Sequence, residues 1–470
     1  MPLIETEVLN LVPKDLAIHY RIVPYQVVDG RLSLYCDQIQ DANLSTELEV
    51  LLDKSVSISQ IPSAELDRLL SVHYLSTATS SVSSIEVSAK IVANQSEDFV
   101  DEVIQNAVSS NSSDIHIEAY EHHARVRYRI DGLMMERYVI NKEEYPALVN
   151  KIKVRANLDI AEKRLPQDGR INFTISDFSV DIRVSILPSF YGEKIVLRLL
   201  RTDNLDYSLD NLGMTEHEKD VFVDAISKPN GIVLISGPTG SGKTTTLYTA
   251  LKLLNKKTRN ILTAENPIEY TISGVNQVQI NEEIGFTFAE ALRSFLRQDP
   301  DVIMIGEIRD AETASMAIRA SLTGHLVLST IHTNSAFGTI SRLKDMGIPS
   351  FLLTETMNIS IAQRLIRKLC NNCKKEIDID PNYRRKYLVD LSNIHTHYKA
   401  VGCNQCMHSG YRGRVAIYDM LPNDMLLKSK IRQETDIQEQ ESDGLKKRVV
   451  SLLSKGITSM DETIPYLIHT

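Results

Sequence analysis

The sequence predicts an α/β protein of several domains, the largest of them built on a parallel sheet. One observation is an apolar run at 232–235 that leads through a glycine-rich segment into helically spaced leucines. A second is a set of apolar runs at 261–262, 302–305 and 326–328, each of which ends in a polar cluster. Strands that alternate with helices are typical of a parallel sheet, with ligands at the carboxyl ends of its strands. The third is the length of 470 residues, which is too great for one hydrophobic core.

Composition and charge exclude several classes of protein. An apolar fraction of 43% is ordinary for a globular chain, and a net charge of −9 argues against a dedicated nucleic-acid binder, which usually has a basic surface. Residues 1–7 lack the basic and apolar regions of a secretion signal, and no apolar stretch approaches the roughly 18 residues of a membrane span. We therefore expect a cytoplasmic protein whose contact with membranes is only peripheral.

The first 75 residues are predicted to form a small mixed unit. Apolar residues alternate from Leu16 to Leu34, with a break at Asp29-Gly30 that is typical of a turn. The polar, small-residue stretch at 76–84 fits a flexible linker, and an ordered polar loop is the alternative. Cys36 lies far from the other cysteines and is expected to be a buried apolar residue.

Residues from 96 onward are predicted to form a helix followed by strands. Apolar residues recur at helical spacing over 100–108, and the runs 124–130, 181–186 and 195–200 alternate between an apolar and a polar face. The polar faces carry the arginines Arg125, Arg127, Arg129, Arg183 and Arg198. Such a sheet is either a binding surface or a solvated charged face, and the pattern leaves both open.

The glycine-rich segment is the strongest local motif in the chain. It matches G-x-x-x-x-G-K-[ST] between a strand and a helix, the context in which this motif binds the phosphates of a nucleotide. Glycines let backbone N–H groups converge on the phosphates, Lys243 neutralises phosphate charge, and the Thr244 hydroxyl can ligate Mg²⁺. The predicted nucleotide-binding residues are Gly237, Pro238, Thr239, Gly240, Ser241, Gly242, Lys243, Thr244 and Thr245.

Polar residues also follow the other predicted core strands. Proteins with this glycine-rich motif usually carry an acidic residue at the end of a second core strand. Here Gly306 stands at that strand end, and Glu307 comes directly after it. The other clusters lie at 265–269 and 330–333. Because they follow the carboxyl ends of parallel strands, we expect them to lie beside the bound nucleotide.

Four of the five cysteines form two C-x-x-C pairs, Cys370 with Cys373 and Cys403 with Cys406. In a reducing compartment this pattern indicates a metal rather than disulfides, and four thiolates suit a structural Zn²⁺. A closed set of four ligands has no open position for a substrate, so we expect the metal to stabilise the fold. Reduced cysteines without a metal are the alternative.

Several motifs, in order, resemble those of the secretion superfamily ATPases, which include the type II secretion ATPase and the type IV pilus extension ATPase. The glycine-rich segment resembles their Walker A motif, and residues 299–310 resemble their atypical Walker B motif. Residues 265–270 resemble their aspartate box, and residues 323–336 their histidine box. Upstream, SSDIHIE, RLPQDGRI and IRVSILPSFYGEKIVLRLL resemble their second N-terminal domain. The resemblance is strong over about residues 95–425.

The resemblance implies a RecA-like P-loop ATPase core, a PAS-like α+β N-terminal domain, a small N-terminal adaptor unit and a zinc subdomain with four cysteine ligands. The expected boundaries are 1–75 for the N-terminal adaptor domain, 76–95 for a linker, 96–201 for the second, arginine-bearing N-terminal domain, 202–211 for another linker, 212–365 for the ATPase core, 366–412 for the zinc subdomain and 413–470 for a C-terminal helical region. No cyclic-dinucleotide signature is evident in the first unit, and no such regulation is predicted.

Catalytic roles are implied by the same resemblance. They are Lys243 for phosphate, Thr244 for Mg²⁺, Glu269 as general base, Glu307 as a ligand of Mg²⁺ through water, His332 as a sensor of the γ-phosphate, and Arg183 and Arg198 as arginines that the N-terminal domain brings to the nucleotide. Which of the two glutamates is the base stays open. Asn266 stands where the family usually has aspartate, and because asparagine carries no charge, the positioning of metal or water there is in doubt.

The implied function is ATP hydrolysis by a ring of subunits, expected to be a hexamer, that powers assembly of a type IV pilus or a type II secretion pseudopilus. The implied partners are an inner-membrane platform protein and a cytoplasmic docking domain of the machine. ATP, Mg²⁺ and a structural Zn²⁺ are the expected cofactors, and no nucleic acid is expected. The zinc module favours extension or secretion, since pilus retraction ATPases typically lack it.

Two other functions remain as alternatives. A nucleic-acid translocase on a RecA-like core would use the arginines at 125–129. A regulatory nucleotide-binding scaffold with weak turnover would explain Asn266. Stimulation of turnover by DNA distinguishes the first from an assembly motor, and tight ATP binding without turnover identifies the second.

Overall fold

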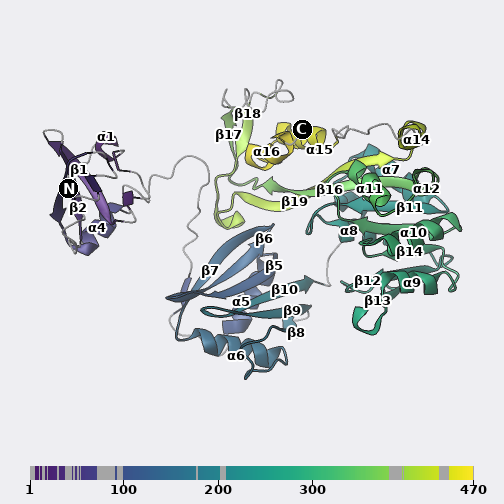
Figure 1. Ribbon diagram of the computed structural model, residues 1–470, viewed down its shortest axis with the longest axis horizontal. Coiled ribbons are helices and arrows are strands. Elements are labelled where there is room, and N and C mark those ends of the chain that lie inside the picture. Colours follow the sequence, from purple (N-terminus) through teal and green to yellow (C-terminus); the bar gives the residue numbers. More distant parts are fainter. Residues whose placement is uncertain are drawn as a thin grey trace. The chain divides into compact units, whose positions relative to one another are not determined.

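The computed structural model describes residues 6–9, 11–12, 16–17, 20–28, 31–37, 45, 48–49, 52, 54–70, 90–92, 99–175, 178–201, 208–379, 394, 396–432 and 444–468. The chain divides into two compact units, residues 1–85 and 86–470 (Figure 1). The break predicted at Asp29-Gly30, the polar stretch at 76–84 and most of the second predicted linker lie outside the described residues. Among the described helices, none has the length and apolar character needed to cross a membrane.

The first unit contains a small mixed sheet. Its described elements are α1 (Thr6–Leu9), β1 (Ile22–Val28), β2 (Arg31–Cys36), β3 (Val56–Gln60) and α4 (Ser63–Leu70). β1 pairs with β2 in the antiparallel sense, which fits the alternating pattern, and β2 pairs with β3 in parallel. Cys36 is 2% exposed and belongs to the apolar cluster of this unit, so it is the core residue that its sequence context predicts.

The arginine-bearing part of the second unit is one sheet covered on one face by helices. Its elements are β4 (Lys90–Val92), α5 (Phe99–Ser109), β5 (Ser112–Ala119), β6 (His123–Ile130), β7 (Leu133–Asn141), α6 (Tyr145–Arg155), β8 (Gln167–Ile175), β9 (Phe178–Ser189) and β10 (Gly192–Arg201). The strand order is β4-β7-β6-β5-β10-β9-β8. Apolar residues of α5, α6 and alternate strand positions form one core, with both helices on the same face of the sheet (Figure 1). Because side chains alternate along a strand, the arginines lie on the opposite face. Residues 90–92 were expected in a linker, but they pair in parallel with β7 as an edge strand.

The ATPase core predicted from the sequence is a sheet, parallel except for its last strand, between two layers of helices. Its strands are β11 (Gly231–Ser236), β12 (Ile261–Glu265), β13 (Asn276–Gln279), β14 (Val302–Ile305), β15 (Leu326–Ile331), β16 (Met357–Leu369) and β19 (Tyr411–Pro422), in the order β13-β12-β14-β15-β11-β16-β19. The helices are α7 (Glu216–Ser227), α8 (Lys243–Leu254), α9 (Phe288–Phe295), α10 (Ala311–Leu322), α11 (Ala336–Asp345) and α12 (Ser350–Thr356). Two apolar clusters occupy the two faces of the sheet, as a doubly covered parallel sheet requires.

The C-terminal part differs from the helical region that was expected at 413–470. Residues 411–422 form β19, which pairs antiparallel with β16 at the edge of the core sheet. The strand forms because successive side chains point to opposite faces and pack in different apolar clusters. Ile417 belongs to one of these clusters and Tyr418 to another. The remaining elements are β17 (Lys375–Asp378), β18 (Thr396–Lys399), α14 (Met425–Arg432), α15 (Gly444–Ser454) and α16 (Met460–Ile468).

Candidate nucleotide site

The glycine-rich loop joins buried β11 to the N-terminus of α8. Gly237 and Gly242 have φ angles of 148° and 87°. A Cβ at Gly237 would lie 2.5 Å from the carbonyl oxygen of Gln363, and one at Gly242 would lie 2.9 Å from its Nε2. Glycine is therefore required at both positions. Thr244 and Thr245 are exposed in the first turn of α8, where a helix N-terminus attracts anions.

Lys243 is buried in a setting that fits a bound phosphate. Its ammonium donates to two carbonyl oxygens of the loop, at 2.8 and 3.0 Å. Burial lowers the pKa of Lys243, and the charge of Arg364 lowers it further, while Glu307 opposes both. The hydroxyl of Ser241 is buried and has no hydrogen-bond partner among the described residues. A buried cation that has only carbonyl partners and an unpartnered hydroxyl are the groups that a phosphate would satisfy.

Glu307 and His332 meet at the carboxyl ends of β14 and β15. His332 Nε2 lies 3.1 Å from Glu307 Oε2, and Arg309 donates to the other carboxylate oxygen. Burial alone would raise the pKa of Glu307, but the hydrogen bonds from Arg309 and His332 outweigh it and the pKa is lowered. The three side chains line a cavity of about 450 Å³. The carboxylate therefore stays ionised beside a space open to water and Mg²⁺.

Glu265, the last residue of β12, and Glu269, in the segment that follows, have different surroundings. Glu265 is 3% exposed and accepts hydrogen bonds from Thr263, Gln277 and Tyr248. Its carboxylate is committed to these partners within the core. The side chain of Glu269 is 40% exposed, so of the two only Glu269 is open to a water molecule.

Arg183 connects the arginine-bearing sheet to the ATPase core. It lies on β9, and its Nη2 is 3.1 Å from the carbonyl oxygen of Ile268 and 3.5 Å from Glu269 Oε2. The structure thus brings together an arginine and the candidate general base, which are 86 residues apart in the sequence. Asn266, the departure from the family pattern, is exposed in the same segment.

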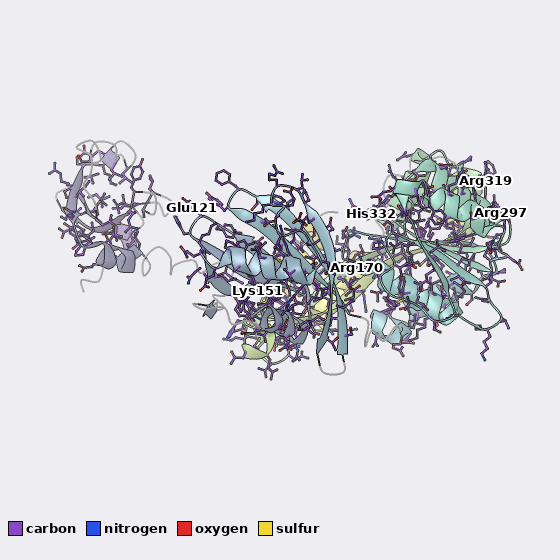
Figure 2. All side chains as sticks on the ribbon, turned by 90° about the horizontal axis from the view of Figure 1, so that it is seen from below. Glu121, Lys151, Arg170, Arg297, Arg319 and His332 are labelled. Atoms are coloured by element: carbon purple, nitrogen blue, oxygen red, sulfur yellow. The ribbon has the colours of Figure 1, made fainter. Side chains whose placement is uncertain are left out.

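Arg198 lies beside Arg183 but has a different partner. The strand register places Arg170 across from Arg183, and Arg183 across from Arg198. All three line a cavity of about 560 Å³. Arg198 Nε donates to Asp114 at 3.0 Å, whereas Arg170 is exposed and forms no ion pair with the described residues (Figure 2). Sequence reasoning missed Arg170, because its alignment with the other two depends on the register of β8.

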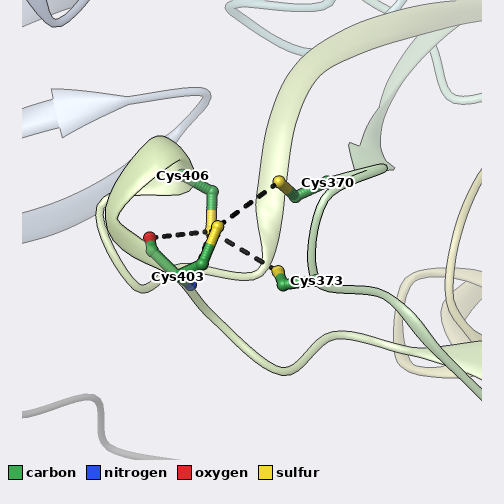
Figure 3. A group of neighbouring side chains, drawn as sticks. All are labelled: Cys370, Cys373, Cys403 and Cys406. Carbon is green, nitrogen blue, oxygen red and sulfur yellow. Dashed lines mark hydrogen bonds between the residues drawn. The ribbon is translucent and has the colours of Figure 1, made fainter.

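The four cysteines of the C-x-x-C pairs converge. Their sulfurs lie within 4.8 Å of one another, and three of the separations are 3.9, 3.8 and 3.7 Å (Figure 3). A tetrahedral Zn²⁺ with Zn–S bonds of about 2.3 Å would separate its sulfurs by about 3.8 Å. The backbone N–H groups of Gly402 and Gly410 also point at two of the sulfurs, which stabilises thiolates. The arrangement fits Zn²⁺. The residues are Cys370, Cys373, Cys403 and Cys406.

Comparison with known proteins identifies the family. A sequence model described as "Type II/IV secretion system protein" matches residues 92–466. This chain belongs to that family. A second model, described as an MshEN domain, matches residues 3–80. The resemblance that the motifs indicate is confirmed.

Relatives and solved structures agree with the family. The type II secretion system ATPase E of Vibrio cholerae is 45% identical over 377 residues, which cover 78% of this chain and 74% of the relative. The type IV pilus assembly ATPase PilB of Myxococcus xanthus is 41% identical over 483 residues, which cover 97% and 85%. The Legionella pneumophila ATPase DotB has a TM-score of 0.60 at 23% identity, covering 81% of this chain and all of DotB, which supports the fold. The pilus retraction motor PilT with bound ADP has a TM-score of 0.51 at 25% identity, covering 77% and 95%.

These matches settle the class of the enzyme. The chain is a secretion ATPase, a P-loop ATP hydrolase with a RecA-like core, as predicted from the Walker motifs. The same family contains proteins named for type II secretion and for type IV pilus assembly, so membership alone does not distinguish the two systems.

Arginines that supported the nucleic-acid alternative are neutralised within the sheet of this secretion ATPase. Glu118 is 5% exposed and accepts hydrogen bonds from Arg125 and Arg127. Burial would raise the pKa of Glu118, but hydrogen bonds from Arg127 and a lysine lower it to about 2. Arg129 lies 3.9 Å from Asp114. Paired guanidinium groups offer little net charge to a phosphate backbone, so this face favours the structural interpretation.

Sequence reasoning assigned no role to Gln363, although the P-loop of the secretion ATPase rests on it. Gln363 is 2% exposed, its Nε2 donates to the carbonyl oxygen of Ser241 at 2.9 Å, and its Oε1 accepts from Thr246 at 2.9 Å. In the sequence, residues 362–365 form no motif that indicates a chemical role. The contact arises because β16 lies next to β11 in the sheet.

Proposed function

We propose that this chain hydrolyses ATP to power assembly of a type IV pilus or a type II secretion pseudopilus. The observation that carries the proposal is the contact of Arg183, on the arginine-bearing sheet, with Glu269 of the ATPase core. An arginine from one domain that meets an acidic group of the other makes the site sensitive to the relative position of the two. ATP bound at the P-loop would thereby link hydrolysis to domain movement. Relatives named for type II secretion and for type IV pilus assembly support the proposal that the chain serves one of these two systems.

Phosphate binding is assigned to residues 237–245. ATP supplies the bond that is cleaved, and Mg²⁺ neutralises the charge that develops on its phosphates. Lys243 would exchange its two carbonyl partners for phosphate oxygens, and Thr244, in the first turn of α8, would be a ligand of the metal. Glu307 would accept a hydrogen bond from a water of the metal, a role for which its lowered pKa keeps it ionised.

Glu269 is proposed as the general base in preference to Glu307. The carboxylate of Glu307 already accepts hydrogen bonds from Arg309 and His332, and its lowered pKa makes it a poor proton acceptor. Glu269 is more exposed, and its one ion pair among the described residues is with Arg183. His332, through its contact with Glu307, is proposed to report the γ-phosphate. Arg183 and Arg198 are proposed to stabilise the charge on the transferring phosphoryl group.

The assembly around this chain is also proposed. We assign residues 1–75 as an adaptor for a cytoplasmic docking domain and residues 90–201 as the mobile domain, which includes the edge strand β4. The motor core is residues 212–365 together with the edge strand β19, the zinc subdomain is residues 366–410, and residues 423–470 form the C-terminal region. Rings, expected to be hexamers, act at the cytoplasmic face of the inner membrane and push on a platform protein. The mass of the ATP-bound particle, compared with that of one chain, tests whether six subunits form the ring.

The test is Mg²⁺-dependent ATP hydrolysis by the purified full chain, with and without DNA. The expected result is turnover that DNA does not change, since the arginines of β6 are already paired. Stimulation by DNA would contradict the assembly motor in favour of a translocase. Tight ATP binding without turnover, even with the platform protein, would indicate a regulatory scaffold and a site weakened at Asn266.

Zinc is proposed to hold the cysteine-bearing segment together, and its loss is expected to destabilise the chain. The purified protein should contain one zinc per chain, and Cys403→Ser should lose it. Because loss of a structural metal removes ligand bonds at once, the free energy of unfolding should fall by about 4 kcal/mol or more. Elemental analysis and thermal unfolding measure both effects. Cys36→Ser, outside the cluster, is the control that should keep the metal; zinc-free protein of unchanged stability would contradict the proposal.

A further inference from the structure

The strand β16 runs alongside the P-loop as well as alongside β11. Ser236, the last residue of β11, is in register with Ala362, so the next residues of β16 lie at the level of the loop. Gln363, the first of them, braces the loop through Ser241 and Thr246. The residue that follows, Arg364, is placed at the same edge of the nucleotide site.

The guanidinium of Arg364 lies between the P-loop and the loop that follows β15. Its Nη2 donates to the carbonyl oxygen of Asn334 at 2.6 Å, and its Nη1 donates to that of Gln363 at 3.0 Å. A Cβ placed on Gly237 would be 3.1 Å from the same Nη1, so the guanidinium lies over the first glycine of the loop. Asn334 comes two residues after His332, within the histidine-containing segment. Arg364 therefore touches both parts of the site that surround the phosphates.

Arg364 has no counter-charge in the part of the chain that the structure describes. Both of its hydrogen bonds go to carbonyl oxygens, and no described carboxylate lies within ion-pair distance. Burial lowers the pKa of Arg364, so the charged form is less well solvated than in water. A guanidinium has five N–H donors, of which these two bonds use two.

A second cation lies near by. Lys243 is likewise buried and bonded to carbonyl oxygens, and the positive charge of Arg364 is one of the causes that lower its pKa, after burial. Two poorly solvated cations of the same chain beside a glycine-rich loop would both be stabilised by one bound polyanion. The phosphates of a nucleotide are an anion of the right size and charge.

We propose that Arg364 is a second phosphate-binding cation of the nucleotide site, which acts together with Lys243 and joins the terminal phosphate to the segment after β15 through the Asn334 carbonyl. This rests on the proposed function, in which ATP occupies the P-loop. Because β16 is part of the core sheet, the arginine comes from the same subunit as the loop and does not depend on domain closure, unlike Arg183. It therefore acts in binding, before the two domains come together.

The experiment compares the full-length wild-type chain with Arg364→Gln and Arg364→Lys. Binding of ADP and of a non-hydrolysable ATP analogue is measured with Mg²⁺, together with ATP turnover and thermal unfolding. Loss of a charge-assisted hydrogen bond predicts that Arg364→Gln binds the triphosphate about tenfold more weakly, with a smaller change for ADP. Arg364→Lys should recover part of the affinity, because the charge is kept while the fork of donors is lost.

Lys368→Gln is the matched control. It removes an exposed positive charge from the same strand, four residues further along, and should leave nucleotide binding unchanged. Unchanged affinity in Arg364→Gln would overturn the proposal. So would an affinity that falls only in step with a lower unfolding temperature, since that identifies a purely structural residue.

Failure of this inference is separable from failure of the proposed function. A wild-type chain that binds and hydrolyses ATP beside an equally active Arg364→Gln variant overturns the role of Arg364 alone. A wild-type chain without turnover contradicts the proposed function, while the binding measurement still tests Arg364. The role of Arg364 and the proposed function are thereby tested by independent readouts.

Discussion

Replacing Lys243 with alanine is expected to abolish ATP turnover, lowering kcat/KM by about 100-fold or more. Lys243 is the first residue of α8 and the cation closest to the P-loop carbonyl oxygens. Its ammonium would move from those carbonyl oxygens to the phosphates, where it stabilises both bound ATP and the charge that develops during cleavage. Mg²⁺-dependent phosphate release at saturating and limiting ATP measures the effect.

Stability, unlike activity, is expected to be almost unchanged in this variant. Burial lowers the pKa of Lys243, which shows that its charged form is disfavoured by the site when no phosphate is bound. Removing the ammonium should therefore leave the unfolding temperature within about 3 °C of wild type. Lys252→Ala, which removes an exposed lysine from the same helix, is the matched control and should keep full activity. Turnover that survives Lys243→Ala would place the reaction at another site.

The second large effect is expected for Arg183→Gln, which should lower kcat by about 100-fold while ATP affinity changes only a few-fold. The reason is position: Arg183 comes from the arginine-bearing sheet and reaches Glu269 rather than the P-loop. A guanidinium there acts on the charge of the transition state and contributes little to ground-state binding. Single-turnover rates and nucleotide affinity, measured on the same preparation, separate the two.

A charge control is available in the same sheet domain. Lys151 lies on α6, which packs on the opposite face from the arginines (Figure 2). Lys151→Gln should therefore leave kcat unchanged. Arg183→Lys should restore only part of the rate, since a lysine keeps the charge but lacks the planar fork of donors. If Arg183→Gln lost ATP affinity and kept kcat, Arg183 would be a nucleotide-binding residue. Its proposed role in stabilising the charge of the transferring phosphoryl group would then be wrong.

Local patterns in the sequence determined the parts of this protein that depend on neighbouring residues. The P-loop was predicted because its strand, glycines and helix are consecutive, and the structure has β11 and α8 on either side of it. The sheet face with Arg183 and Arg198 followed from alternation, which the backbone of a strand imposes. The cysteine site followed from the C-x-x-C spacing, which places two thiolates of each pair in one turn.

Tertiary structure alone decided the contacts between groups far apart in the chain. Arg183 meets Ile268 across 85 residues, and Gln363 meets Thr246 across 117, because the order of the strands brings their ends together. The same holds for residues 411–422, which form an edge strand of the core sheet rather than part of a helical region. The spacing and alternation of residues in the sequence indicate on which face of a strand or helix a side chain lies. Which distant residue it contacts depends on the order and register of the strands. For this reason the P-loop was evident from the sequence, and Arg364 beside it was not.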